Sequence, residues 1–244
     1  MKYFNREALE KLKSEVRRAP SGFRYGFAPD IFRDDVYEAI VDGFPDVKTF
    51  ALKDIDAGGG RKRFYSGPVY YIGGDYGSVR KFSKLSDVWR GIVAESSSEE
   101  FVSLLREATG VRFNSVCNFG FAYGKEGSVQ EPHLDGAVLK TKSISGTIAC
   151  LLYVNKDPGG VSGTRVYGTD RKTVLYEVPD LRNSFFFFEQ HPDAWHGFPT
   201  VPAGADRRIL SLTYCEEPKP VRLTGSLAYS LLPLRAKKFL QGVS

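Results

Sequence analysis

Between Val111 and Tyr214 the chain consists of short apolar or β-branched runs separated by turn residues, and this pattern restricts the fold more than any other feature. The runs cover residues 116–123, 147–154, 164–167, 173–178, 184–188 and 208–214. Turn signals lie between them, at Gly124, 157–160, 179–180 and Gly204. Many short strands with regular turn signals predict an antiparallel barrel or sandwich. Runs such as TIACLLYV and SFFFF are apolar at consecutive positions, so both faces of those strands should be covered.

The first half of the chain has helical spacing instead. Residues 3–18 form an amphipathic pattern that ends before Pro20. Three more helices are predicted, at 34–41 with a stop at Gly43, at 87–95, and at 98–108 with a capping box of Ser97 and Glu100 and a stop at Gly110. Helices followed by strands predict a mainly β fold with flanking α-helices, namely a double-stranded β-helix (jelly-roll, cupin-like) barrel with an N-terminal helical layer.

The length of 244 residues is compatible with one domain. We predict a single unit in which residues 1–110 form a helical part that bears a lid, 111–216 form the jelly-roll core, and 217–244 form a tail that packs on the core. With 42% hydrophobic residues the chain can bury a substantial core, which excludes a disordered polypeptide.

Charge and cysteine content narrow the partners and the compartment. A net charge of +5 favours an anionic small molecule and is too modest to indicate nucleic acid. Neither a secretory signal nor a membrane span is visible in the sequence, so a cytoplasmic location is expected. Cys117, Cys150 and Cys215 are widely spaced and odd in number, which predicts buried free thiols.

The Gly-, Tyr- and basic-rich segment 58–82 has two interpretations. The favoured one is a solvated loop with one strand at 69–72, because short basic runs are common on protein surfaces. The alternative is a mobile lid over a site, in which Arg61, Lys62 and Arg63 offer charge to an anionic substrate.

A set of possible metal ligands lies within the strand-rich half. His133 and Asp135 would point to the same side of an extended segment, and His196 would come from a distant strand. Two imidazoles and one carboxylate on one face of a metal are typical of non-haem Fe(II) sites with open positions. The plainer alternative is a pair of partly buried histidines and an aspartate that caps a turn. His191 is the remaining histidine, and we favour His196 over it.

Arg208 opens the strand RILSLTY. A guanidinium at the start of a barrel strand can bind a carboxylate through two parallel hydrogen bonds. If Arg208 faces the barrel interior, Leu210, Leu212 and Tyr214 face inward with it and Arg207 points outward.

From Asn118 to Tyr214 the chain resembles the 2-oxoglutarate/Fe(II)-dependent dioxygenases, in particular their prolyl-hydroxylase-like branch. The resemblance is carried by FAYGKEGSVQEPHLDG, ACLLYVNKDPGGVSGTRVYG, SFFFFEQHPDAWHGFP and RRILSLTY. Members typically have a tyrosine ten residues before the HxD histidine, a Tyr-aliphatic-Asn strand end, and an aromatic residue six positions after the cosubstrate-binding cation. Tyr123, Tyr153 and the pair Arg208/Tyr214 match these positions. The resemblance implies that Tyr123, Tyr153 and Arg208 bind 2-oxoglutarate.

The same resemblance implies the reaction. Fe(II), 2-oxoglutarate and O2, with ascorbate as an auxiliary reductant, would hydroxylate an unactivated C–H bond and release succinate and CO2, with no catalytic side chain beyond the metal centre. We expect a small-molecule substrate, such as a metabolite, amino acid, sugar or nucleotide. A peptidyl (prolyl-type) hydroxylase is the alternative, and desaturation, ring closure or epimerisation use the same centre.

Two departures narrow the resemblance. Related halogenases have Gly or Ala where this chain has Asp135, which argues against halogenation. Nucleic-acid demethylases have a second arginine several residues after the first, whereas Arg207 and Arg208 are adjacent here, which argues against base demethylation.

Two alternatives from other classes are a non-catalytic metal-binding jelly roll that senses or binds sugars, and a zinc hydrolase with three protein ligands and a bound water. The carboxylate-binding residues count against the first.

Overall fold

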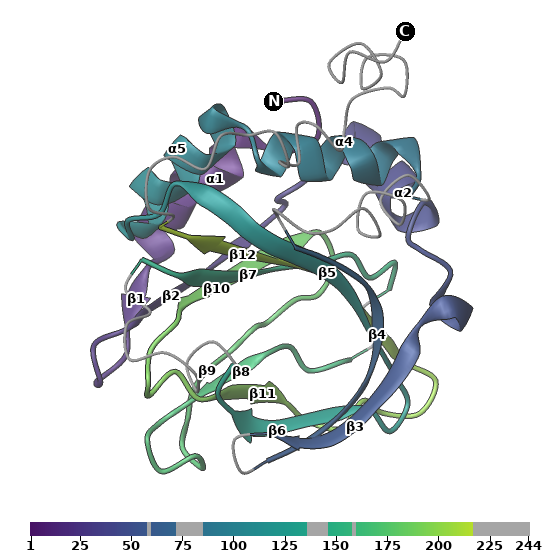
Figure 1. The fold of residues 1–244 in the computed structure, drawn as a ribbon, viewed down its shortest axis with the longest axis vertical. Coiled ribbons are helices and arrows are strands. Elements are labelled where there is room, and N and C mark those ends of the chain that lie inside the picture. Colours follow the sequence, from purple (N-terminus) through teal and green to yellow (C-terminus); the bar gives the residue numbers. More distant parts are fainter. Residues whose placement is uncertain (58–59, 72–84, 136–145, 158–159, 217–244) are drawn as a thin grey trace, which may run out of the picture.

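The computed structural model describes residues 1–57, 60–71, 85–135, 146–157 and 160–216. Within these residues, twelve strands pair into one antiparallel sheet that curls round on itself, and a layer of helices covers one side of it (Figure 1). The strand order is β1-β2-β10-β7-β12-β5-β4-β6-β11-β8-β9, with β3 paired to β4. The predicted mainly β jelly-roll fold with a helical layer is therefore confirmed.

The four predicted helices are present, as α1 (Arg6–Glu15), α2 (Asp34–Asp42), α4 (Asp87–Ser96) and α5 (Glu99–Thr109). A short 3-10 helix, η1 (Val47–Thr49), was not predicted. Gly110 ends α5 in the left-handed conformation with φ 66°, as its position predicts. The cap of α5 was assigned one residue too early, because Ser98, not Ser97, accepts a hydrogen bond from the Phe101 backbone N–H.

The strands include all six predicted apolar runs and several more. Their bounds are β1 (Arg17–Arg18), β2 (Arg24–Pro29), β3 (Ala51–Ala57), β4 (Gly60–Tyr71), β5 (Ser115–Lys125), β6 (Val129–His133), β7 (Ile148–Tyr153), β8 (Arg165–Tyr167), β9 (Val174–Glu177), β10 (Ser184–Glu189), β11 (His196–Phe198) and β12 (Asp206–Cys215). The predicted strand at 69–72 overlaps the end of β4, but the prediction of a loop over residues 60–68 is wrong, because β4 begins at Gly60 and forms an antiparallel hairpin with β3. Residues 58–59 and 72–82 of that segment lie outside the described residues.

The central strands are apolar on both faces because each face contacts a different apolar layer. On one face of β7, Ile148, Cys150 and Leu152 belong to the core shared with the helices, which includes Trp89 of α4. On the other face, Ala149 and Tyr153 belong to a second core inside the barrel. Each large side chain buried in this way contributes roughly 1.5–3 kcal/mol.

A disulfide joins β5 to β12, which corrects the prediction that all three thiols are free. Cys117 pairs with Cys215, with their Cα atoms 6.0 Å apart. The register of the two strands shifts between Thr213 and Tyr214, so Cys117 is the extra residue of a bulge next to its partner. This proximity depends on strand pairing across 98 residues, which cysteine spacing does not reveal. Cys150 is free and buried, as predicted.

Two further predictions concern the ends and the surroundings of the chain. The predicted tail at 217–244 lies outside the described residues. The division of a single domain into a helical part at 1–110, a core at 111–216 and this tail stays a prediction. Within the part of the chain that the structure describes, no helix has the length and apolar character needed to cross a membrane. The cytoplasmic location stays a prediction.

Candidate metal centre and cosubstrate pocket

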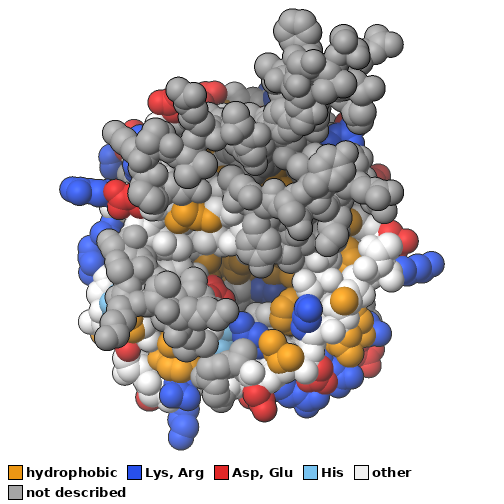
Figure 2. Space-filling view, in the orientation of Figure 1, with side chains coloured by type: hydrophobic (Ala, Val, Ile, Leu, Met, Phe, Trp, Pro, Cys, Tyr) orange, Lys and Arg blue, Asp and Glu red, His pale blue; other side chains and the backbone are white. Residues whose placement is uncertain are grey.

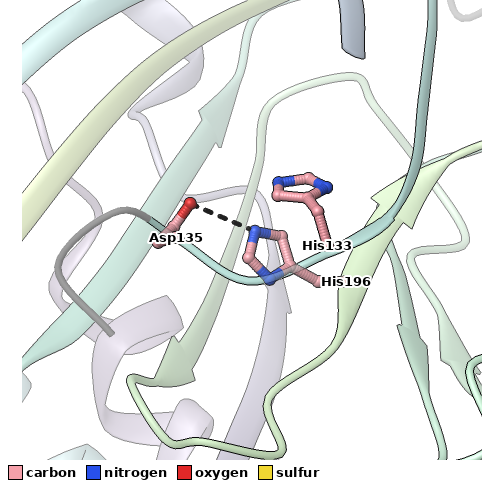
Figure 3. Close-up of side chains that lie close together, drawn as sticks. All are labelled: His133, Asp135 and His196. Carbon is pink, nitrogen blue, oxygen red and sulfur yellow. Dashed lines mark ion pairs between the residues drawn. The ribbon is translucent and has the colours of Figure 1, made fainter. Parts of the chain in front are cut away.

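The structure brings His133, Asp135 and His196 together inside the barrel. His133 is the last residue of β6, Asp135 follows two residues later, and His196 is the first residue of β11. The two strands pair so that His196 lies directly opposite His133, and the two ring centroids are 4.3 Å apart. One ligand atom from each of the three residues lies within 4.8 Å of the others. Figure 3 shows the three side chains converging on one space.

A glycine makes this convergence possible. A Cβ atom at Gly197 would lie 2.1 Å from the Gln130 carbonyl oxygen of β6. No side chain fits at that distance, so any larger residue would push β11 away from β6. The HG dipeptide at 196–197 therefore places the second histidine beside the first.

Hydrogen bonds fix the direction in which each ligand points. The Nδ1 atom of His133 lies 2.8 Å from the Glu131 carbonyl oxygen, and that of His196 lies 2.9 Å from the Ala194 carbonyl oxygen. A carbonyl only accepts, so each Nδ1 carries the proton and each Nε2 has a free lone pair. The Gln190 amide donates to Oδ2 of Asp135 at 2.7 Å, and Oδ1 lies 3.5 Å from Nε2 of His196. Two nitrogen donors and one oxygen donor are thus directed at a common point.

The surroundings of His133 and Asp135 favour the protonation states in which these two residues bind a metal. Burial, assisted by the neighbouring His196 and Lys62, lowers the pKa of His133 to about 2. Burial alone would raise the pKa of Asp135, but His196, Lys62 and His133 together hold it well below its usual range. At neutral pH His133 is therefore a neutral donor and Asp135 is ionised, as metal binding requires.

The cluster lies in the wall of a cavity of about 380 Å³. Its described lining comes mainly from β4, β5, β7, β10 and β12, and includes Lys62, Phe64, Asn118, Ala122, Gln130, Thr147, Leu151, Thr164, Phe188, Gln190, Arg207 and Ile209. In Figure 2 a hollow opens on this face, and acidic, basic and histidine side chains meet inside it.

Arg207 is a buried guanidinium in this cavity. Its side chain donates from Nη2 to Oγ1 of Thr164 at 2.6 Å and to the Tyr153 hydroxyl at 3.4 Å, and its guanidinium carbon lies 4.1 Å from the Phe198 ring centroid. Its Nε is buried and has no hydrogen-bond partner among the described residues, and no described carboxylate forms an ion pair with it. Burial lowers the pKa of Arg207. A buried cation without a counter-ion marks a place for an anionic ligand.

The structure does not place Arg208 in the cavity, which corrects the predicted orientation of β12. Arg208 lies on the opposite face, where its Nε donates to Oδ2 of Asp206 at 2.9 Å. Leu210, Leu212 and Tyr214 share this face with Arg208, as predicted, but they pack in the core next to the helices. The cavity is lined instead by Arg207, Ile209, Ser211 and Thr213. The polar Ser211 and Thr213 were the sequence signal for this orientation.

The two tyrosines that were predicted to bind 2-oxoglutarate also have different environments. Tyr153 is fully buried beside Arg207, and its hydroxyl donates to Oγ1 of Thr164 at 2.6 Å. Tyr123 lies opposite Arg208 in the pairing of β5 with β12, with its ring centroid 6.3 Å from that of Tyr65. It is not among the described residues that line the cavity.

The remaining histidine lies elsewhere. The His191 ring is 5.9 Å from the Phe23 ring, and its Nδ1 accepts a hydrogen bond from the Asp193 backbone N–H. It is not a member of the three-residue cluster. Sequence reasoning missed Thr164, which supports both Tyr153 and Arg207, and Gln190, which orients Asp135. Their roles depend on contacts between distant strands, for which the sequence has no local motif.

Comparisons with known proteins bear on the fold. No protein-family model and no curated protein matches the sequence. A prolyl-4-hydroxylase from Pseudomonas putida superposes with a TM-score of 0.54 at 13% identity, over 87% of this chain and 99% of that one. A 2OG-Fe(II) oxygenase family oxidoreductase from Burkholderia pseudomallei gives 0.56 at 13%, over 88% and 94%. This chain has the fold of the 2OG-Fe(II) oxygenases.

A third structure with this oxygenase fold has a different described activity. The non-haem α-ketoglutarate-dependent carbocyclase SnoK from nogalamycin biosynthesis superposes with a TM-score of 0.56 at 11% identity, over 90% of this chain and 88% of that one. At these identities the likeness establishes the oxygenase fold alone, so the chemistry has to be argued from the site.

The residues of the site fit both groups that oxygenases of this fold use. The donors from His133, Asp135 and His196 form the two-histidine, one-carboxylate set that suits Fe(II) and leaves coordination positions open. The guanidinium of Arg207 has a buried Nε without a hydrogen-bond partner and no carboxylate partner among the described residues, so it could donate to a carboxylate of 2-oxoglutarate.

Proposed function

We propose that this protein is an Fe(II)- and 2-oxoglutarate-dependent oxygenase that hydroxylates an unactivated C–H bond of a small molecule and releases succinate and CO2. The observation that carries the proposal is that the His133–Asp135–His196 cluster lies in the wall of the same cavity as the buried guanidinium of Arg207, which has no carboxylate partner among the described residues. Iron and 2-oxoglutarate, when bound, supply the oxidising chemistry, and the protein supplies position and environment.

The metal ligands have assigned atoms. Nε2 of His133, Nε2 of His196 and a carboxylate oxygen of Asp135 would hold the iron. The Glu131 and Ala194 carbonyls keep the two imidazoles in the tautomer that leaves Nε2 free. Gln190 occupies the other oxygen of Asp135, so the carboxylate is oriented before the metal binds.

Arg207 takes the role that the sequence assigned to Arg208. It would bind the distal carboxylate of 2-oxoglutarate, while Thr164 and Tyr153 hold its guanidinium in place. Tyr153 thereby retains a place at the cosubstrate, through Arg207 and Thr164. Tyr123 has no such role in this proposal, because its side chain is not among the described cavity lining.

Two properties of the cavity support a small-molecule substrate. Its volume of about 380 Å³ lies within the range of small-ligand sites, roughly 300–1,000 Å³. Leu151, Phe188 and Ile209 give it apolar walls that restrict the access of water to the reacting atoms.

Succinate formation tests the proposal. The purified protein with Fe(II), ascorbate and 2-oxoglutarate should convert the keto acid to succinate, slowly without substrate. Asp135→Ala and His196→Ala should abolish this turnover, since each removes one donor of the cluster. His191→Ala is the matched control and should keep it, because His191 lies outside the cluster. Full turnover by the Asp135 variant would contradict the proposal.

Spectroscopy and metal analysis separate the alternatives. Adding 2-oxoglutarate to the anaerobic Fe(II) protein should produce a weak visible absorption band. A protein that retains zinc in preference to iron, hydrolyses a substrate and gives no band would be a zinc hydrolase. Metal binding with neither band nor turnover would indicate a sensor or sugar binder. A substrate screen monitored by succinate release distinguishes a metabolite from a peptidyl substrate.

A further inference from the structure

The basic triplet of β4 is divided between the surface and the cavity. Arg61 and Arg63 point outward to the same carboxylate of the neighbouring strand β3, with Nε of Arg61 3.1 Å and Nε of Arg63 3.8 Å from Asp54. Lys62 lies between them and, because side chains alternate along a strand, points the other way. Lys62, Phe64 and Ser66 all line the cavity.

Within the part of the chain that the structure describes, the Lys62 side chain has no hydrogen bond or close ion pair, and the carboxylate that acts on it electrostatically is Asp135. No described carboxylate forms an ion pair with its ammonium group, whereas both adjacent arginines have one. Lys62 is partly buried, and a cation withdrawn from water is costly unless an anion compensates for it. The proposed function gives Asp135, the only acidic residue of the described lining, to the metal.

The position of Lys62 places it on the metal side of the cavity. It pairs in register with Gln130 of β6, the strand that ends at His133. Arg207 lies on β12, and β5 separates β12 from β4. Two strand spacings correspond to about 10 Å along the sheet, so Lys62 and Arg207 enter the cavity from separate strands.

The charges of the loaded cavity do not balance without another anion. Iron would bring two positive charges, and Lys62 and Arg207 one each, while Asp135 contributes one negative charge and 2-oxoglutarate two. These side chains are the only ionised ones in the described lining of the loaded cavity, because His133 and His196 would bind the metal as neutral imidazoles. One positive charge therefore remains, and it lies on the side of the cavity that Arg207 does not serve.

We propose that Lys62 is a substrate-binding residue, and that the substrate is a small molecule with a carboxylate that pairs with the Lys62 ammonium group. The proposal rests on the proposed function, because it takes the iron and the 2-oxoglutarate as bound. It assigns a role to one member of the basic triplet and leaves Arg61 and Arg63 as surface residues.

The test uses acetate as the probe and Mn(II) as a paramagnetic substitute for iron. Wild type, Lys62→Gln and Arg63→Gln are loaded with Mn(II) and 2-oxoglutarate without O2, and the relaxation of the acetate methyl protons reports binding near the metal. Wild type and Arg63→Gln should bind acetate equally well. Lys62→Gln should bind it about tenfold more weakly or worse, because a charge-assisted hydrogen bond is lost. Neutral acetamide should not bind measurably to any of the three.

Each of the other possible results would contradict a specific part of the proposal. Equal acetate affinity in Lys62→Gln and wild type, acetamide binding as strong as acetate binding, or no acetate binding to wild type would reject the role of Lys62. Tighter binding of methyl phosphate than of acetate would reject the carboxylate in favour of a phosphate. A loss of 2-oxoglutarate affinity in Lys62→Gln would assign Lys62 to the cosubstrate. Failure of the wild type to bind Mn(II) and 2-oxoglutarate is measured separately and would reject the proposed function itself.

Discussion

At the scale of single residues, the two adjacent arginines of β12 have opposite environments. Arg207 is buried in the cavity and lacks a carboxylate partner among the described residues, whereas Arg208 is partly exposed and pairs with Asp206. The sequence predicted that Arg208 binds 2-oxoglutarate, whereas the structure places Arg207 in the cavity wall, and the proposed function therefore gives this role to Arg207. The choice depends on which face of β12 the helices cover, and the polar Ser211 and Thr213 on the Arg207 face indicate that this face lines the cavity.

Replacing each arginine separately by glutamine tests which of the two binds 2-oxoglutarate. Arg207→Gln should raise the KM for 2-oxoglutarate by roughly ten- to a hundredfold, since a charged hydrogen bond to a carboxylate contributes about 1.5–3 kcal/mol. Arg208→Gln should change it less than threefold. Steady-state succinate assays over a range of 2-oxoglutarate concentrations give both values. The reverse ranking of the two variants would restore Arg208 as the cosubstrate ligand.

At the scale of secondary-structure elements, the metal cluster depends on how closely β11 approaches β6. The sequence predicts β5, β7, β10 and β12 well because they are long and apolar. It placed His133 on an extended segment and His196 on a distant strand but could not predict the bounds of β6 and β11, since β6 reads VQEPH and β11 has three residues. The ligands themselves could still be named from their types and order. Their proximity could not be derived, because it comes from the pairing of these two short strands.

Gly197→Ala tests the importance of this approach. The new methyl group would lie 2.1 Å from the Gln130 carbonyl oxygen, so β11 must move and carry His196 with it. We expect at least a tenfold loss of Fe(II) or Mn(II) affinity, together with a destabilisation of roughly 1–3 kcal/mol from overpacking. Calorimetric metal titration and urea unfolding measure the two effects.

Gly168→Ala is the control for this substitution. Its added Cβ would meet no backbone atom closer than 3.8 Å, and its nearest neighbour is the side-chain oxygen of Asp170 at 3.2 Å. Metal affinity should therefore match that of the wild type. A Gly197→Ala protein with unchanged metal affinity would show that β11 has room to adjust without displacing His196.

At the scale of the whole molecule, the helical layer and the barrel are joined by a few buried polar contacts as well as by apolar packing. Tyr37 of α2 donates from its hydroxyl to the Asn155 carbonyl oxygen at 2.8 Å and accepts from the Asn183 backbone N–H at 2.9 Å. Asn155 in turn accepts from the Arg208 backbone N–H, at the start of the strand that bears Arg207. Sequence patterning predicted the helical layer and the barrel, but it could not predict this connection, which involves polar groups from three separate segments.

The ionisation of Tyr37 should therefore affect global stability in alkaline solution. Burial raises the pKa of Tyr37 to about 12, whereas an unfolded tyrosine loses its proton near 10.0. Below pH 10 the Tyr37 hydroxyl is protonated in both the folded and the unfolded protein, so its hydrogen bonds contribute fully to the free energy of unfolding. Between about pH 10 and 12 the unfolded state releases a proton that the folded state keeps, so unfolding becomes more favourable by about 1.4 kcal/mol for each pH unit.

Tyr37→Phe isolates this contribution from that of the other tyrosines. At pH 8 the variant should be less stable than wild type by about 1–3 kcal/mol, because the Asn155 carbonyl and the Asn183 N–H lose their partner. The difference should shrink as the pH rises from 10 toward 12, since only the wild type loses stability through Tyr37. Urea unfolding at a series of pH values measures it. A difference that stays constant up to pH 12 would mean that the Tyr37 hydroxyl ionises as readily in the folded protein as in the unfolded chain, and that the helical layer does not keep it from water.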